Sequence, residues 1–215
     1  MATRIDHFMY AFPSLAAGTA WAETTFGVAP AYGGEHVGLG TRNALLSLDN
    51  TYLEIIVPDP AQELANTFGE RLAALSEGGL VTWAAEGDLH AIAATLAQQD
   101  VQTLGPNRTQ RQTAEGDLLE WELLFPTGSP HGGRMPFFID WLACTNPRLT
   151  TPAGGVFNSM AIVTPQADAL HNILQSIGLD IPVSAGEPAI TVNVTAPAGE
   201  VVLASTDETR ALSLR

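Results

Sequence analysis

The sequence alternates β-like and helix-like segments in a pattern that occurs three times, and this pattern constrains the fold more than any other feature. Apolar strands are predicted at residues 5–12, 79–85 and 156–163. Each is followed by a segment whose apolar residues recur at helical spacing. A strand followed directly by a helix is therefore the unit of this chain.

Capping residues mark where these helices begin and end. Ser14 and Asp88 are predicted N-caps of the first two helices, and Thr164, followed by a proline, is predicted to open the third. Gly27 and Gly178 follow the last apolar position of the first and third helices, where glycine commonly ends a helix.

The segments that follow each helix are β-like, and they decide the fold class. Each unit therefore has the order βαβββ, which predicts an α+β protein with curved mixed sheets. The β-like segments are 43–48 with 52–57, 118–125 with 136–142, and 189–194 with 201–204. The predicted division is a first module at 3–58, a connecting helix at 60–78, a second module at 79–143 and a partial third module at 155–206.

Charge and hydropathy exclude several classes of partner. The formal net charge of −14 disfavours binding to nucleic acid and to anionic membranes. No apolar run reaches the roughly 20 residues that span a bilayer, and the N-terminus does not resemble a secretory signal, so a cytoplasmic protein is expected. The single cysteine, Cys144, lies in no zinc-binding or redox spacing. The expected partner is a small molecule.

Two predicted strands each present a candidate metal-ligating side chain among apolar residues. His7 lies in the strand at 5–12 and Glu54 in the strand at 52–57. Burying either group costs free energy unless it is hydrogen-bonded, paired or bound to a cation. Core histidines are often simply hydrogen-bonded, and Glu54 would face either a cavity or solvent, so the residues alone leave both readings open.

Three motifs, in this order, resemble the glyoxalase-like branch of the vicinal oxygen chelate superfamily, which also includes bleomycin-resistance proteins and dihydroxybiphenyl dioxygenases. The resemblance covers residues 3 to about 142. It implies that paired βαβββ modules form a cup, with side chains of the first and last strands facing a divalent metal. The motifs are Asp6-His7, the glycine-rich segment Gly33–Asn43, and Tyr52-Leu53-Glu54.

The resemblance implies a set of metal ligands. His7 and Glu54 match the first-strand and last-strand ligands of module one, and Asp140 takes the last-strand place in module two. Thr82 or Trp83 stands where a second histidine is expected, which departs from the family pattern, and His36 is the candidate to replace it. Such a set suits Fe, Mn, Ni or Zn without choosing among them.

The resemblance also implies a function. A metal-dependent lyase, isomerase or dioxygenase is expected, in which the metal chelates vicinal oxygens of the substrate and Glu54 or Asp140 acts as general base. The alternatives are a metal-free protein that binds or sequesters small molecules, and a scaffold whose third module mediates a homodimer. The candidate substrate-pocket residues are Arg42, Asn43, Trp83, Trp121, Arg134, Phe138 and Trp141.

Overall fold

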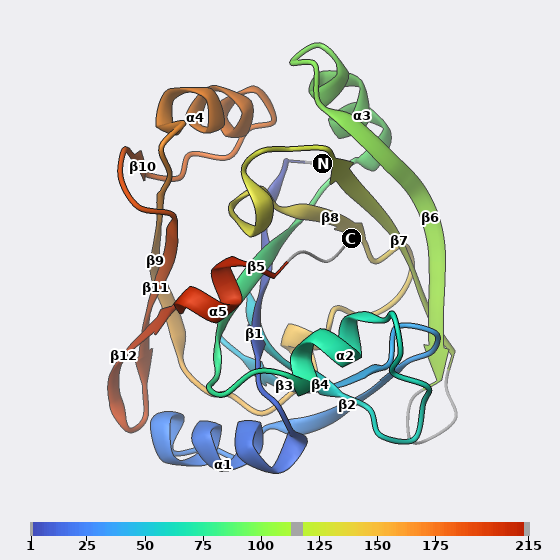
Figure 1. Cartoon of the computed structure of the whole chain (residues 1–215), viewed down its shortest axis with the longest axis vertical. Helices are drawn as coiled ribbons and strands as arrows, with labels where there is room; N and C mark the ends of the chain where they lie inside the picture. Colours follow the sequence, from blue (N-terminus) through green and yellow to red (C-terminus); the bar gives the residue numbers. More distant parts are fainter. Residues whose placement is uncertain (1, 113–117, 213–215) are drawn as a thin grey trace.

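The computed structural model describes residues 2–112 and 118–212, which form two β-sheets with helices around them (Figure 1). The larger sheet has eight strands in the order β2-β3-β4-β1-β5-β8-β7-β6. These strands are β1 (Arg4–Ala11), β2 (Ala31–His36), β3 (Thr41–Ser47), β4 (Tyr52–Pro58), β5 (Gly79–Glu86), β6 (Gln102–Gln112), β7 (Leu118–Thr127) and β8 (Phe137–Asp140).

The smaller sheet has the order β10-β9-β11-β12. Its strands are β9 (Val156–Val163), β10 (Val183–Ser184), β11 (Ala189–Ala196) and β12 (Gly199–Ala204). The helices are α1 (Leu15–Phe26), α2 (Phe68–Ala73), α3 (Leu89–Ala97), α4 (Ala167–Ser176) and α5 (Asp207–Arg210), with 3₁₀ turns η1 at Gly132–Arg134 and η2 at Pro147–Leu149.

The larger sheet consists of two halves with the same strand pairing. β1 pairs in parallel with β4, and β5 pairs in parallel with β8, so the first and last strands of each half are neighbours. The halves join where β1 runs antiparallel to β5. The sheet curls until its edge strands β2 and β6 are in contact. This confirms the predicted α+β class with βαβββ modules and a curved sheet.

The helix signals explain where the first helices begin and end. The side chains of Ser14 and Asp88 each accept a hydrogen bond from a backbone N–H in the first turn of the helix that follows. Gly27 closes α1 with a φ of 73°, a conformation that favours glycine. The predicted start of the third helix was wrong. Helix α4 begins at Ala167 after a turn at Pro165 and Gln166, and the Thr164 hydroxyl accepts a hydrogen bond from the N–H of Gln166 in that turn.

Other differences from the sequence prediction lie in polar segments. The residues preceding His36, predicted as a glycine-rich loop, form strand β2, and the polar strand β6 was not recognised individually. Within 60–78 only Phe68–Ala73 is helical. The periodicity of apolar residues is weak in β2 and β6, so it could not define these strands. In 60–78 the helical spacing of Leu64, Phe68, Leu72 and Leu75 predicted a longer helix than the structure contains.

The two faces of the larger sheet have different roles. Its outer face packs against α1, α3 and the smaller sheet, in one apolar core to which both sheets contribute. The rings of Phe8 in β1 and Phe157 in β9 lie 5.2 Å apart within this core. The inner face carries a separate apolar cluster next to α2. The inner face therefore remains available for a cavity.

The C-terminal unit repeats the order of elements of the modules but not their strand pairing. β9 pairs in parallel with β10 and antiparallel with β11, whereas β12 pairs only with β11 among the described strands. In Figure 1 this sheet lies along the side of the molecule opposite β6.

None of the helices within residues 2–112 and 118–212 has the length and apolar character that crossing a bilayer requires.

Candidate functional site

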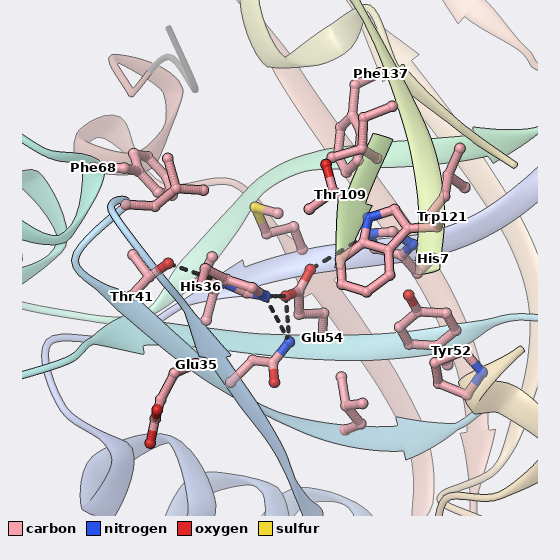
Figure 2. Close-up of a pocket in the computed structure, with 18 of the residues that line it drawn as sticks. His7, Glu35, His36, Thr41, Tyr52, Glu54, Phe68, Thr109, Trp121 and Phe137 are labelled. Atoms are coloured by element: carbon pink, nitrogen blue, oxygen red, sulfur yellow. Dashed lines mark hydrogen bonds and ion pairs between the residues drawn. The ribbon is translucent and has the colours of Figure 1, made fainter. Parts of the chain in front are cut away.

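The inner face of the curled sheet lines a cavity of about 420 Å³. Side chains from both modules line it, and the two walls differ in chemistry (Figure 2). Most of the polar side chains in the lining come from module one, and we call this side the polar wall, whereas module two contributes mainly apolar side chains. The volume is within the range of small-molecule pockets, about 300–1,000 Å³.

A β-bulge at the start of β1 brings two successive side chains into one network. The pairing of β1 with β5 skips Asp6, since Ile5 lies opposite Ala85 and His7 opposite Ala84. Side chains of successive strand residues normally point to opposite faces. Here Asp6 Oδ2 lies 2.7 Å from His7 Nδ1, and both residues are buried.

Glu54 is the central acceptor of the polar wall. His7 Nε2 lies 3.4 Å from its Oε2, on neighbouring strands β1 and β4. Asn43 Nδ2 donates to Glu54 Oε1 over 2.6 Å, and His36 Nε2 lies 3.7 Å from the same oxygen. Figure 2 shows His7 and His36 on either side of the carboxylate. His36 Nδ1 lies 2.9 Å from the Thr41 hydroxyl, which fixes the ring.

The network stabilises charges that burial alone would suppress. Burial lowers the pKa of His7, but hydrogen bonds to Asp6 and Glu54 outweigh it and raise that pKa to about 9. Burial raises the pKa of Glu54, but the His7 hydrogen bond, the nearby His36 charge and the Asn43 amide together lower it to about 2. Both ring nitrogens of His7 face carboxylate oxygens, and this geometry favours a hydrogen on each nitrogen. The site is thus an imidazolium–carboxylate pair at neutral pH.

Asp6 also connects the polar wall to module two. Its Oδ1 accepts hydrogen bonds from Trp141 Nε1 over 3.1 Å and from Asn146 Nδ2 over 2.6 Å. Its backbone carbonyl accepts a hydrogen bond from the hydroxyl of Thr51. A single buried carboxylate therefore holds the imidazole and positions an indole of the opposite wall.

Aromatic and aliphatic side chains form the second wall. The rings of Phe125 and Phe137 stack at 5.5 Å, and those of Trp121 and Trp141 lie 5.5 Å apart with a tilt of 44°. Phe137 also meets the His7 ring edge-on at 5.4 Å, so the aromatic surface reaches the polar network. Leu123 and Ile139 complete this wall.

The structure brings four residues predicted from the motifs to the cavity: His7, His36, Asn43 and Glu54. Of the predicted aromatic residues, Trp121 and Trp141 also line it. Thr109, Gln110, Tyr52 and Phe137 line it as well and were not assigned to it from the sequence. The predicted second-module residues otherwise lie elsewhere.

Asp140 does not reach the cavity. In β8 the side chains of Phe137 and Ile139 face inward, so Asp140 belongs to the opposite set, and its Oδ1 accepts a hydrogen bond from the backbone N–H of Leu142. Phe138 points to the outer core for the same reason. Asp140 and Phe138 were assigned to the cavity from a strand that is apolar on both faces. Such a strand has no alternation of polar and apolar residues to show which face points inward.

Three further predicted pocket residues also lie outside the lining. Trp83 is completely buried in the outer core, where its Nε1 donates to the carbonyl of Arg134. Arg42 lies between Thr41 and Asn43 in β3, which both face the cavity, and therefore points away from it. The side chain of Arg134 is not part of the lining either.

The donor set fits a divalent metal only on one wall. Two imidazoles and one carboxylate are ligands that Fe, Ni or Zn accept. However, Asn43 directs an N–H at Glu54, and the described residues of module two contribute no His, Cys, Asp or Glu to the lining. Ala84 stands opposite His7, where a second ligand could have come from β5. Within the described residues no group of three or more such side chains is placed to hold a metal. The residues present therefore do not fit the divalent metal that the sequence predicts.

A family model described as a glyoxalase-like domain matches residues 5–178 of the chain. None of the curated proteins matches it at a significant level. The matched residues span both modules and reach to the end of α4.

Solved structures are similar to this chain at low sequence identity. A hypothetical protein from Staphylococcus aureus has a TM-score of 0.63 and 17% identity, over 95% of this chain and 85% of that one. Methylmalonyl-CoA epimerase from Mycobacterium tuberculosis has a TM-score of 0.48 and 18% identity, over 63% of this chain and 85% of that one. A variant of the Streptomyces coelicolor enzyme in complex with 2-nitronate-propionyl-CoA has a TM-score of 0.49 and 22% identity, over 68% of this chain and all of that one.

Proposed function

The chain belongs to the family of glyoxalase-like domain proteins, and on this premise we propose that its cavity is the active site of an enzyme that moves a proton on a small molecule. The observation that carries the proposal is the buried His7–Glu54 ion pair on the floor of an otherwise largely apolar cavity. Ionisable groups with strongly shifted pKa values in a cleft are typical of catalytic sites.

The two members of the pair have different roles in this proposal. The His7 imidazolium directs Nε2–H toward the cavity, where it can donate to a substrate oxygen in place of Glu54. When it does so, Glu54 loses the strongest of the interactions that lower its pKa, and burial then raises that pKa. Substrate binding thus converts an ion-paired carboxylate into a general base.

The chemical step then follows from these positions. Glu54 removes a proton from a carbon next to the substrate carbonyl, and the C–H electron pair moves onto the carbonyl oxygen as an enolate. His7 stabilises the negative charge on that oxygen through its hydrogen bond. Return of the proton to the other end gives an isomerisation, and expulsion of a leaving group gives a lyase reaction.

No step is assigned to the metal predicted from the sequence, because the donor set is incomplete on the side of module two. The divalent metal therefore stays a prediction. Lyase and isomerase chemistry, also predicted, remain within the proposal, whereas ring-opening dioxygenation does not.

Deuterium exchange tests the proposal without knowledge of the natural product. A panel of aromatic and aliphatic ketones and hydroxyketones is incubated with the protein in D₂O, and loss of the exchangeable C–H signal is followed by NMR. Exchange by the wild type should fall at least about 100-fold in Glu54→Gln, since a base typically contributes 10²–10⁴-fold. Glu122→Gln, a neutralised carboxylate on the outer side of β7, is the matched control.

A binding protein without catalysis is the second candidate, because the aromatic wall can hold a ligand whether or not Glu54 reacts. In that case ligands bind to the wild type, and exchange is no faster with the wild type than with Glu54→Gln. This result would refute proton transfer.

A further inference from the structure

The charged groups around the cavity determine which ligands it can accept. All nine basic residues apart from histidine are arginines, and none of the seven whose side chains the structure describes lines the cavity. Arg42 and Arg134, the two cations predicted to hold a substrate carboxylate, are both outside the lining. Carboxylates do line it, since both the buried Glu54 and the exposed Glu35 belong to the lining. Among the described side chains an anionic ligand would therefore meet two carboxylates and no guanidinium, and the His7 imidazolium is already paired with Asp6 and Glu54.

A cationic ligand would find no spare countercharge on the floor of the cavity. Glu54 already faces His7 and accepts from Asn43. Behind it, Asp6 is satisfied by His7, Trp141 and Asn146. Glu35 also lines the cavity but is exposed to solvent, so a cation brought to the buried part beside Glu54 would be desolvated without an unpaired carboxylate there to offset the cost.

The shape and surface of the second wall favour a flat ring. The stacked rings of Phe125 and Phe137 and the tilted pair of indoles present aromatic surface over one side of the cavity. Aromatic rings stack offset or edge to face on such surfaces, with a gain beyond simple burial. The polar groups are concentrated opposite, at Glu54 and the residues around it (Figure 2).

We propose that the site selects an uncharged, planar aromatic molecule that carries a carbonyl or hydroxyl group at one end. The ring lies against Trp121, Phe125 and Phe137, and the oxygen faces His7 and Glu54. Carboxylates, phosphate esters and ammonium compounds of the same shape are excluded by the balance of charges. This inference deepens the proposed function and rests on the same cavity.

A matched set of naphthalene derivatives tests the charge preference by isothermal titration calorimetry at pH 7. The probes are 2-acetonaphthone, which is neutral, 2-naphthoate, an anion, and 2-naphthylmethylammonium, a cation. We expect 2-acetonaphthone to bind to the wild type at least about tenfold more tightly than either charged probe. Equal or tighter binding of a charged probe overturns the inference, as does the failure of all three to bind at millimolar concentration.

A variant that adds one cation to the lining separates charge from shape. Gln110 lines the cavity, and Gln110→Arg should strengthen 2-naphthoate binding at least about tenfold relative to 2-acetonaphthone. Gln99→Arg adds the same charge at an exposed position after α3 and should leave the preference unchanged. An unchanged preference in Gln110→Arg would contradict the electrostatic argument.

The binding measurement is independent of turnover, so the two proposals can fail separately. Selective binding of 2-acetonaphthone without deuterium exchange on any carbonyl compound would refute proton transfer and leave the ligand class standing. Faster exchange on aliphatic or charged compounds than on the neutral aromatic ketone would refute the ligand class and leave proton transfer standing.

Discussion

The indole of Trp141 donates a hydrogen bond to Asp6 across 3.1 Å, although the two residues lie 135 positions apart in the chain. The same carboxylate holds Nδ1 of His7. The aromatic wall of module two and the ionisable floor of module one are therefore positioned by one buried group.

Replacing Asp6 should disturb both walls. In Asp6→Asn the amide has the size of the carboxylate, but the substitution removes the negative charge that favours the His7 imidazolium. We expect the pKa of His7 to fall by at least about one unit and stability to fall by about 1–3 kcal/mol. Histidine ¹⁵N NMR and thermal unfolding measure the two effects. Asp180→Asn, at an exposed carboxylate, is the control. An unchanged His7 pKa would mean that Asp6 has no electrostatic role.

The His7 network should also make stability depend on pH. The pKa of His7 rises from 6.5 to about 9 on folding, so the imidazolium contributes its full stabilisation below pH 6.5 and loses it as the pH rises through 9. The shift corresponds to about 3 kcal/mol. Denaturant unfolding of the wild type and His7→Gln between pH 6 and 10 measures this difference, which should narrow with rising pH. A constant difference would contradict it.

Glu54 gives the opposite dependence at low pH. Its pKa falls from 4.5 to about 2 on folding, so the carboxylate stabilises the native state above pH 4.5 and this contribution is lost as the pH falls toward 2. Unfolding of the wild type and Glu54→Gln from pH 5 to pH 2.5 should therefore converge at the acid end. Parallel curves would show that Glu54 is not ion-paired in solution.

Gly33 should be essential for the position of Asn43. A Cβ at residue 33 would come within 2.1 Å of Asn43 Oδ1 and 2.9 Å of Leu45 Cδ1. We expect Gly33→Ala to cost about 1–3 kcal/mol of stability and to weaken the hydrogen bond to Glu54. In the background of Asn43→Ala the same substitution should cost less, because its closest neighbour is gone. Equal costs in the two backgrounds would show that the two positions are not coupled.

Elemental analysis tests whether the protein binds the divalent metal that the sequence predicts. Because the described residues of module two place no ligand in the lining, we expect protein purified without an affinity tag to hold less than a stoichiometric amount of Fe, Mn, Ni or Zn. Chelation should then leave the melting temperature unchanged. One equivalent of metal, lost in both His7→Ala and His36→Ala, would instead support the sequence-based ligand set.

The sequence predicts the fold of this chain well because its apolar segments are strongly patterned. The strands at 5–12, 79–85 and 156–163 and the caps Ser14 and Asp88 define the repeated units. Strand β6 was not recognised, because it is polar and contains both Gly105 and Pro106. Its contribution to the cavity, Thr109 and Gln110, could therefore not be foreseen.

A residue of the candidate site could be predicted only where the alternation of apolar residues in its strand shows which face of the sheet its side chain occupies. Around Glu54 the core residues Leu53 and Ile55 place the carboxylate on the opposite face. Asp140 follows three consecutive apolar residues, so nothing in its strand indicates which face it takes. The contact between Asp6 and His7 depends on a bulge, which no periodicity reveals.

The two walls of the cavity come from separate strands of separate modules. Substitutions at Trp121, Leu123 or Phe125 can therefore change what fits while leaving the residues around Glu54 in place. Selectivity and reactivity are divided between the two halves of the molecule. Substitutions in module two can therefore change selectivity while the reactive groups of module one stay in place.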